Sequence, residues 1–182
     1  MSTVILFLLA LGLAMDCFAI AISNSSISGP VKPGIPLKVA IAFAFAHMVM
    51  LFFGFQLGGL IRSLFEGNEP FVALFILLFI GSKMIMDARK RKPQSRVFDI
   101  NEARVIITLS VAGSMDAFLA GVAGGIKELS LFHAGALITL TVFIFSLAGM
   151  SGGQNFGLNY AKNIGLIGGI LIILAGIGMF LG

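Results

Sequence analysis

Residues 13–22 read LAMDCFAIAI and residues 113–122 read GSMDAFLAGV, so the same Met-Asp-x-Phe core occurs twice, 100 positions apart. In each copy an aspartate, Asp16 or Asp116, stands inside a run of apolar or small residues. A buried carboxylate is costly unless it is paired, coordinated or protonated. Other features of the sequence are therefore needed to account for the presence of two such acids.

The composition of the chain indicates whether it folds in water or in a membrane. Hydrophobic residues make up 58% of the 182 residues and charged residues only 11%, whereas soluble domains are roughly a quarter charged. A water-soluble surface cannot be built from this inventory. We therefore expect an integral membrane protein.

The apolar residues fall into runs of the length that a membrane helix needs. A bilayer core of about 30 Å requires about 20 apolar residues per helix. Barrel strands would alternate polar and apolar residues, but these runs are continuously apolar. The sequence therefore predicts an all-α polytopic membrane protein with six transmembrane helices. The predicted helices lie near residues 3–23, 38–60, 70–87, 105–125, 131–151 and 163–182.

Basic residues are concentrated in the connection 88–104, which holds six of the twelve Lys and Arg residues. The connection lacks the aromatic interleaving of a nucleic-acid surface, so no nucleic-acid partner is expected. The bias of basic residues toward the cytoplasmic side explains the cluster instead. It predicts a plasma membrane (bacterial inner membrane) protein with both termini on the non-cytoplasmic side.

The two aspartate segments belong to a longer internal repeat. LLFIGSKMI (77–85) matches IILAGIGMF (172–180) at a shift of 95, and Gly54 and Gly58 have counterparts at the same shift. A unit of three helices crosses the membrane an odd number of times, so its second copy is inverted, as in many secondary transporters. The predicted parts are a first three-helix repeat (1–87), the basic cytoplasmic connection (88–104) and a second, inverted repeat (105–182).

The two carboxylates predict a cation site near the middle of the membrane. At about 1.5 Å per residue, Asp16 lies about 10 Å and Asp116 about 16 Å from the cytoplasmic ends of their helices. Like charges in one low-dielectric cavity repel, so the pair binds protons or a divalent cation and can exchange one for the other. Lys83, near the cytoplasmic end of the third helix, is expected to extend to the interface. The carboxylates then lack a basic partner, which favours a cationic substrate.

Other side chains are candidate metal ligands beside Asp16. Oxygen donors suit Mg, Ca and Mn; Asn24 supplies an amide, and Asp87 closes the third helix. His47, at a depth comparable with Asp16, adds a nitrogen that favours Mn or a later metal. Structural roles remain open for His47, as a satisfied core residue, and for Asp87, as an interfacial ion pair. Cys17 is expected to pack.

MDCFAIAIS in the first helix, SMDAFLAGV in the fourth and GSKMIMD at the end of the third resemble segments of the bacterial manganese efflux pumps of the MntP family, within the LysE-type exporter group. The resemblance covers essentially the whole chain. It implies Mn²⁺ export, with Asp16 and Asp116 as the family's intramembrane aspartates and Asp87 as the acid that closes GxKM. His47 departs from the pattern, which has a glutamine there.

The combined expectation is a secondary transporter, not an enzyme, that exports Mn²⁺ by proton antiport, with the metal as cargo and no cofactor. Moving a divalent cation outward against 100 mV costs about 4.6 kcal/mol, and the sequence contains no GxxxxGK[ST] phosphate loop for ATP. Two alternatives stay open: a LysE-type exporter of amino acids or other small organic solutes, and a non-transporting membrane protein with structural aspartates. An oligomer is compatible with the sequence, which does not indicate its size.

Overall fold

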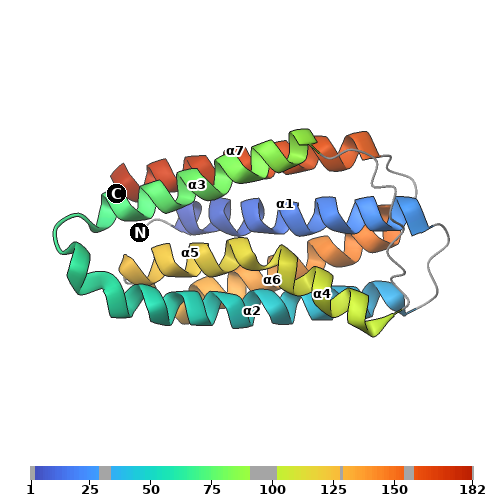
Figure 1. Cartoon of the computed structure of the whole chain (residues 1–182), viewed down its shortest axis with the longest axis horizontal. Helices are drawn as coiled ribbons and strands as arrows, with labels where there is room; N and C mark the ends of the chain where they lie inside the picture. Colours follow the sequence, from blue (N-terminus) through green and yellow to red (C-terminus); the bar gives the residue numbers. More distant parts are fainter. Residues whose placement is uncertain (1–2, 29–33, 91–101, 128, 154–157, 182) are drawn as a thin grey trace.

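The computed structural model is a bundle of helices that run in both directions along its long axis (Figure 1). Six segments within the described residues are long and apolar enough to cross a bilayer, which confirms the predicted all-α membrane architecture. The structure describes residues 3–28, 34–90, 102–127, 129–153 and 158–181, so most of the basic connection lies outside it. The elements are α1 (Thr3–Ser28), α2 (Ile35–Ile61), the 3-10 helix η1 (Arg62–Phe65), α3 (Glu69–Lys90), α4 (Ala103–Gly113), α5 (Met115–Ile126), α6 (Leu131–Gly152) and α7 (Leu158–Leu181).

Glycine and proline set the helix boundaries. Gly34 has a φ of 92° and precedes α2, whose first turn contains Pro36. Gly67, with a φ of 82°, turns the chain between η1 and α3. A positive φ favours glycine, and proline is pre-organised for a first helical turn. The start of α1 and the end of α7 lie at the same end of the bundle as the connection between α2 and α3 (Figure 1).

The fourth predicted helix, 105–125, is confirmed as a membrane-length segment, Ala103–Ile126, but it is interrupted within its length and forms α4 and α5. Ser114 lies between α4 and α5 with φ −95° and ψ 2°. Its hydroxyl donates to the carbonyl oxygen of Val111 at 3.0 Å and so competes with the helical backbone for that acceptor. Gly113 further lowers the helical stability at this point. The break comes two residues before Asp116.

The exterior of the bundle is apolar and polar groups lie inside. Phe45, Phe75 and Phe132 are 66%, 73% and 81% exposed, whereas His47 and Asp116 are 1% and 6% exposed. In water such a surface would associate or aggregate. In lipid it is the expected arrangement, because ionisable residues of membrane helices face the bundle interior.

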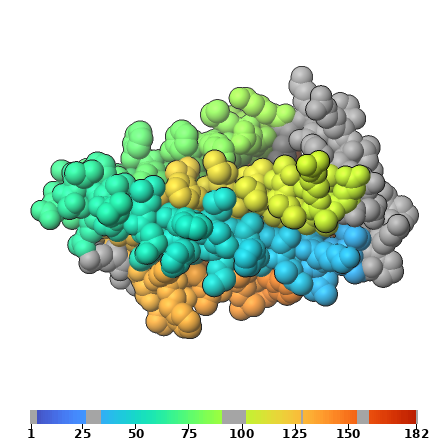
Figure 2. All heavy atoms as spheres, turned by 60° about the horizontal axis from the view of Figure 1, so that its bottom comes forward, coloured from blue at the N-terminus to red at the C-terminus, as the bar shows by residue number. Residues whose placement is uncertain are grey.

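Several pairs of helices are packed through glycines, among them α2 with α5 and α6 with α1. α4 and α5 form a strip between α2 and α3 on one face (Figure 2). Gly54 and Gly58 of α2 lie directly against the backbone of α5, at Phe118 and Val122. The corresponding glycines of α6 lie against α1 in the same way. These second contacts are Gly149 to Phe18 and Gly153 to Ile22.

Replacing Gly54 with alanine is expected to destabilise the packing of α2 on α5, because the new methyl group would meet the backbone at Phe118. Overpacking of this kind costs roughly 1–3 kcal/mol, so the thermal unfolding midpoint in detergent should fall, as followed by fluorescence-detected gel filtration. Gly59→Ala is the matched control, since a methyl group there meets no described atom within 4 Å. Equal stability of the two variants would contradict this packing.

Candidate ion-binding site

Lys83 of α3 and Asp116 of α5 form an ion pair inside the bundle. The distance from Lys83 Nζ to Asp116 Oδ1 is 2.7 Å, and the two side chains are 42% and 8% exposed. The expectation that Lys83 extends to the interface and leaves the carboxylates without a basic partner was therefore wrong. The flexible four-carbon stem of lysine allows its ammonium group to reach the neighbouring helix.

Helix packing orients both members of this pair. Gly81 of α3 lies against α7 at Gly169, and Lys83, two residues later, points about 200° away from that contact. Gly121 of α5 lies against α2, and Asp116, five residues earlier, points about 140° away. The two side chains therefore meet in the space between α3 and α5.

The break at Ser114 also sets the place of Asp116 in its helix. Asp116 lies in the first turn of α5. The backbone hydrogen bonds on either side of the break run from the Ser114 amide to the Ser110 carbonyl at 3.1 Å and from the Phe118 amide to the Ser114 carbonyl at 3.2 Å. The carboxylate of Asp116 is thus held at the start of α5 and paired there with an ammonium group.

Asp16 shares the electrostatic surroundings of Asp116. It is partly buried on α1, which runs through it without a break. The charges of Asp16 and Asp116 both act on the buried thiol of Cys17, and both act on the ammonium group of Lys83. Two acids that lie 100 positions apart in the sequence therefore act on the same two groups.

His47 is buried between α1 and α2, and both of its ring nitrogens are engaged. Nδ1 lies 3.0 Å from the carbonyl oxygen of Phe43 and Nε2 lies 3.4 Å from Sγ of Cys17. Because a carbonyl only accepts, Nδ1 carries a proton, and Nε2 of the neutral ring accepts from the thiol. Cys17 packs as expected. A metal at His47 would have to replace this thiol at Nε2.

The remaining candidate ligands point to other groups. Asn24 donates through Nδ2 to the carbonyl oxygen of Ile20 at 2.8 Å, along its own helix. Asp87 is exposed on α3, one turn beyond Lys83, and its charge acts on that ammonium group. Across the described part of the chain, no group of three or more His, Cys, Asp or Glu is arranged to hold a metal. A metal would therefore need oxygen donors of another kind or a rearrangement of these side chains.

Sequence reasoning missed Lys83 as a member of the site. The available signal was its place in GSKMIMD (81–87), where it has apolar neighbours and lies one turn before Asp87. A lysine at that depth can either extend to the membrane interface or reach an acid on another helix. From the sequence alone, extension to the nearby interface is the expected choice. The break at Ser114 also had a signal, the Gly-Ser pair directly before Met-Asp.

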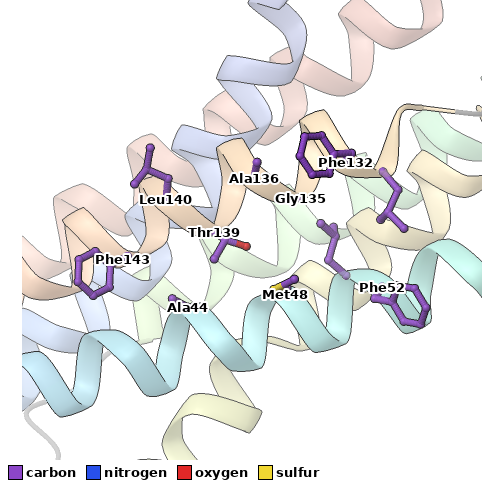
Figure 3. A pocket seen from close by; sticks show the side chains of 11 residues that line it. Ala44, Met48, Phe52, Phe132, Gly135, Ala136, Thr139, Leu140 and Phe143 are labelled. Atoms are coloured by element: carbon purple, nitrogen blue, oxygen red, sulfur yellow. The ribbon is translucent and has the colours of Figure 1, made fainter.

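A groove of about 680 Å³ lies between α2 and α6, away from the charged residues (Figure 3). Met48, Phe52 and Phe132 contribute apolar surface, and the hydroxyl of Thr139 is the one oxygen drawn among its labelled side chains. None of the described lining residues is charged. This composition suits lipid chains and offers nothing to a metal ion, so the groove is not the ion site.

Six membrane-length helices that enclose two acids and a lysine define a polytopic membrane protein of the transporter class. A family model described as "Putative manganese efflux pump" matches residues 30–180. The chain therefore belongs to the MntP family, whose members are transporters and not enzymes.

Relatives match over nearly the whole chain. A "Putative manganese efflux pump MntP" of Crocosphaera subtropica is 32% identical over 168 residues, covering 92% of this chain and 89% of the relative. A protein of the same name from Bacteroides fragilis is 33% identical over 177 residues, covering 94% and 91%. No solved structure matches the chain.

The thiol of Cys17 is fully buried against His47, so it should resist alkylation by N-ethylmaleimide in the folded protein. His47→Ala removes the ring that covers it, and we expect at least a severalfold faster reaction, measured by intact-protein mass spectrometry. Cysteine introduced at the exposed Glu102 provides the fast-reacting control. Rapid labelling of Cys17 in the unmodified protein would contradict the contact between α1 and α2.

Proposed function

We propose that the chain exports Mn²⁺ across the plasma membrane and that Asp16 and Asp116 bind the ion. The observation that carries the proposal is that Asp116 is buried in an apolar bundle and paired with Lys83, while Asp16 is partly buried on α1 in the same bundle. Membership in a family named for manganese efflux supplies the identity of the metal.

The charge of the site suits a divalent cation. Two carboxylates balance a doubly charged ion, and hard oxygen donors suit Mn²⁺ better than thiol or thioether ligands do. We assign secondary roles to Asn24, His47 and Asp87. The amide of Asn24 and the imidazole of His47 join the ligand set only after leaving their present partners. Asp87, at the exposed end of α3, attracts the cation on the cytoplasmic side.

We also propose that the chain consists of two inverted three-helix repeats, 1–87 and 105–182, joined by the cytoplasmic connection 88–104. The paired glycine contacts support this arrangement, because the contact of α2 with α5 has a counterpart between α6 and α1 at equivalent positions. The antiparallel course of α1 and α5 is consistent with it (Figure 1). In this topology both termini lie on the non-cytoplasmic side.

Proton antiport is the proposed source of energy. Export of a divalent cation against 100 mV costs about 4.6 kcal/mol, so a passive pore would admit Mn²⁺ rather than expel it. Carboxylates that release the metal outside can take up protons there, because two acids in one low-dielectric site repel and this favours protonation. Protons would then return inward as Mn²⁺ leaves.

Asp16→Asn and Asp116→Asn are each expected to abolish Mn²⁺ tolerance in a manganese-sensitive host, because an amide cannot supply the negative charge. The loss should be at least about 100-fold in transport rate, with both variants inserted at normal levels. Glu66→Gln, an exposed acid in the connection before α3, is the matched control. Full activity of both Asp variants would refute the site and favour a non-transporting protein with structural aspartates.

Proton coupling is tested in proteoliposomes with a pH-sensitive dye inside. An imposed proton gradient should drive uphill Mn²⁺ movement, and an imposed Mn²⁺ gradient should move protons in the opposite direction. An uncoupler should abolish the first effect. Mn²⁺ flux that ignores the proton gradient in both directions would remove antiport from the proposal and leave metal export intact.

Lys83 favours a second candidate function, export of a small zwitterion such as an amino acid. A substrate ammonium group could bind Asp16 or Asp116 while Lys83 binds the substrate carboxylate, so the site contains the basic partner that such a substrate needs. Isothermal titration of the purified protein with Mn²⁺ and with a panel of amino acids distinguishes the two functions. Heat from amino acids and none from Mn²⁺ would favour the second.

A further inference from the structure

Lys83 is within reach of more than one acid. It contacts Asp116 directly at 2.7 Å, and the charges of Asp87 and Asp16 also act on it. Asp87 lies four residues later on the same helix and is exposed. Side chains at i and i+4 are neighbours on a helix surface. The ammonium group therefore has a second acidic partner one helical turn away, toward the exposed end of α3.

The charge balance makes the contact of Lys83 with Asp116 incompatible with a bound divalent ion. Two carboxylates and the ammonium group carry a net charge of −1, whereas adding a divalent cation to all three would give +1. The ammonium group also occupies Oδ1 of Asp116, so a metal held by both oxygens of this carboxylate would need that position. A metal that binds Asp116 must therefore displace Lys83, and the half-exposed stem of Lys83 leaves it room to move.

We propose that Lys83 is an exchangeable internal cation, which holds Asp116 in the metal-free protein and moves to Asp87 when a divalent metal takes its place. This inference rests on the proposed binding of Mn²⁺ by Asp16 and Asp116. Lys83 remains an ammonium group in both positions, so the exchange involves movement of a charge and no covalent step.

The exchange has consequences for both binding and release. Lys83 competes with the metal for Asp116, so it weakens the apparent affinity for the metal. The same competition accelerates release, because the ammonium group returns to Asp116 as the metal leaves. Lys83 also lowers the negative charge of the metal-free site, because it pairs with Asp116. Removing the positive charge should therefore tighten metal binding and slow turnover. If Lys83 were merely structural, its substitution should instead weaken metal binding and lower the transport rate.

The test is a titration of the full-length protein in detergent with Mn²⁺ alone, together with efflux from proteoliposomes. Lys83→Gln should bind Mn²⁺ about five- to a hundredfold more tightly and show a lower maximal rate with a lower half-saturating concentration. Lys83→Arg, which keeps the charge, should restore most of the rate. Lys162→Gln, an exposed lysine on α7, is the matched control and should resemble the unmodified protein.

A double-mutant cycle tests the second position. Asp87→Asn removes the alternative partner, so it should weaken Mn²⁺ binding in the unmodified background. In the Lys83→Gln background the effect should be clearly smaller, because only the attraction of Asp87 for the cation is then lost. Weakening by the same factor in both backgrounds would show that Asp87 acts on the metal directly, which overturns the exchange. Unchanged or weaker affinity in Lys83→Gln, with binding still lost in Asp116→Asn, would overturn it as well. Binding retained in both Asp16→Asn and Asp116→Asn would instead refute the proposed function.

A measurement on the unmodified protein avoids dependence on variant folding. Lysine acetylation by an N-hydroxysuccinimide ester, quantified by peptide mass spectrometry, reports how accessible each ammonium group is. Saturating Mn²⁺ should raise the labelling of Lys83 several-fold relative to Lys162, since the side chain leaves the buried acid for the exposed one. Equal labelling of Lys83 with and without Mn²⁺ would overturn the exchange.

Discussion

The contact between Lys83 and Asp116 is the interaction on which the interior of this bundle depends. The bilayer core offers no water to solvate a carboxylate, so an unpaired charge there is costly. Asp116 lies in the first turn of α5 and is paired there with the ammonium group of Lys83. This pairing exists because of backbone features, the glycine packing that rotates α3 and the break just before α5.

The two aspartates have different surroundings although their sequence segments are alike. α1 passes through Asp16 as an unbroken helix, whereas Ser114 interrupts the chain just before Asp116. Lys83 has glycine at the position that the internal alignment makes equivalent, Gly178. Asp116 is therefore paired with a lysine that has no counterpart in the other half of the alignment. Such a difference suits a site that holds a cation at one stage and releases it at another.

The sequence predicts the helices well because lipid imposes a simple length requirement on apolar runs. It also identifies Asp16 and Asp116, since an acid in such a run is conspicuous, and it predicts the packing of Cys17. The pairing of Lys83 could not be predicted because it depends on how α3 is rotated, which the contact of Gly81 with α7 determines. The engagement of His47 with Cys17 likewise depends on the relative rotation of two helices. The helix is interrupted at Ser114 because its side-chain hydroxyl binds the Val111 carbonyl in place of a backbone amide. The helix propensities of the local residues do not predict which of these two hydrogen bonds forms.

The glycine contacts restrict how the molecule can change shape. Where α2 meets α5, glycines of α2 touch the backbone of α5. Where α6 meets α1, glycines of α6 lie directly against backbone and side-chain atoms of α1. Each pair consequently behaves as a rigid block, since close-packed interfaces adopt discrete arrangements and do not deform gradually. α3 meets α5 through a long, flexible lysine, so the two helices can part there without disturbing either block. A movement that opens the interior would thus separate the helices mainly at the contact between α3 and α5. The place where the molecule opens would then also be the place of its charged residues.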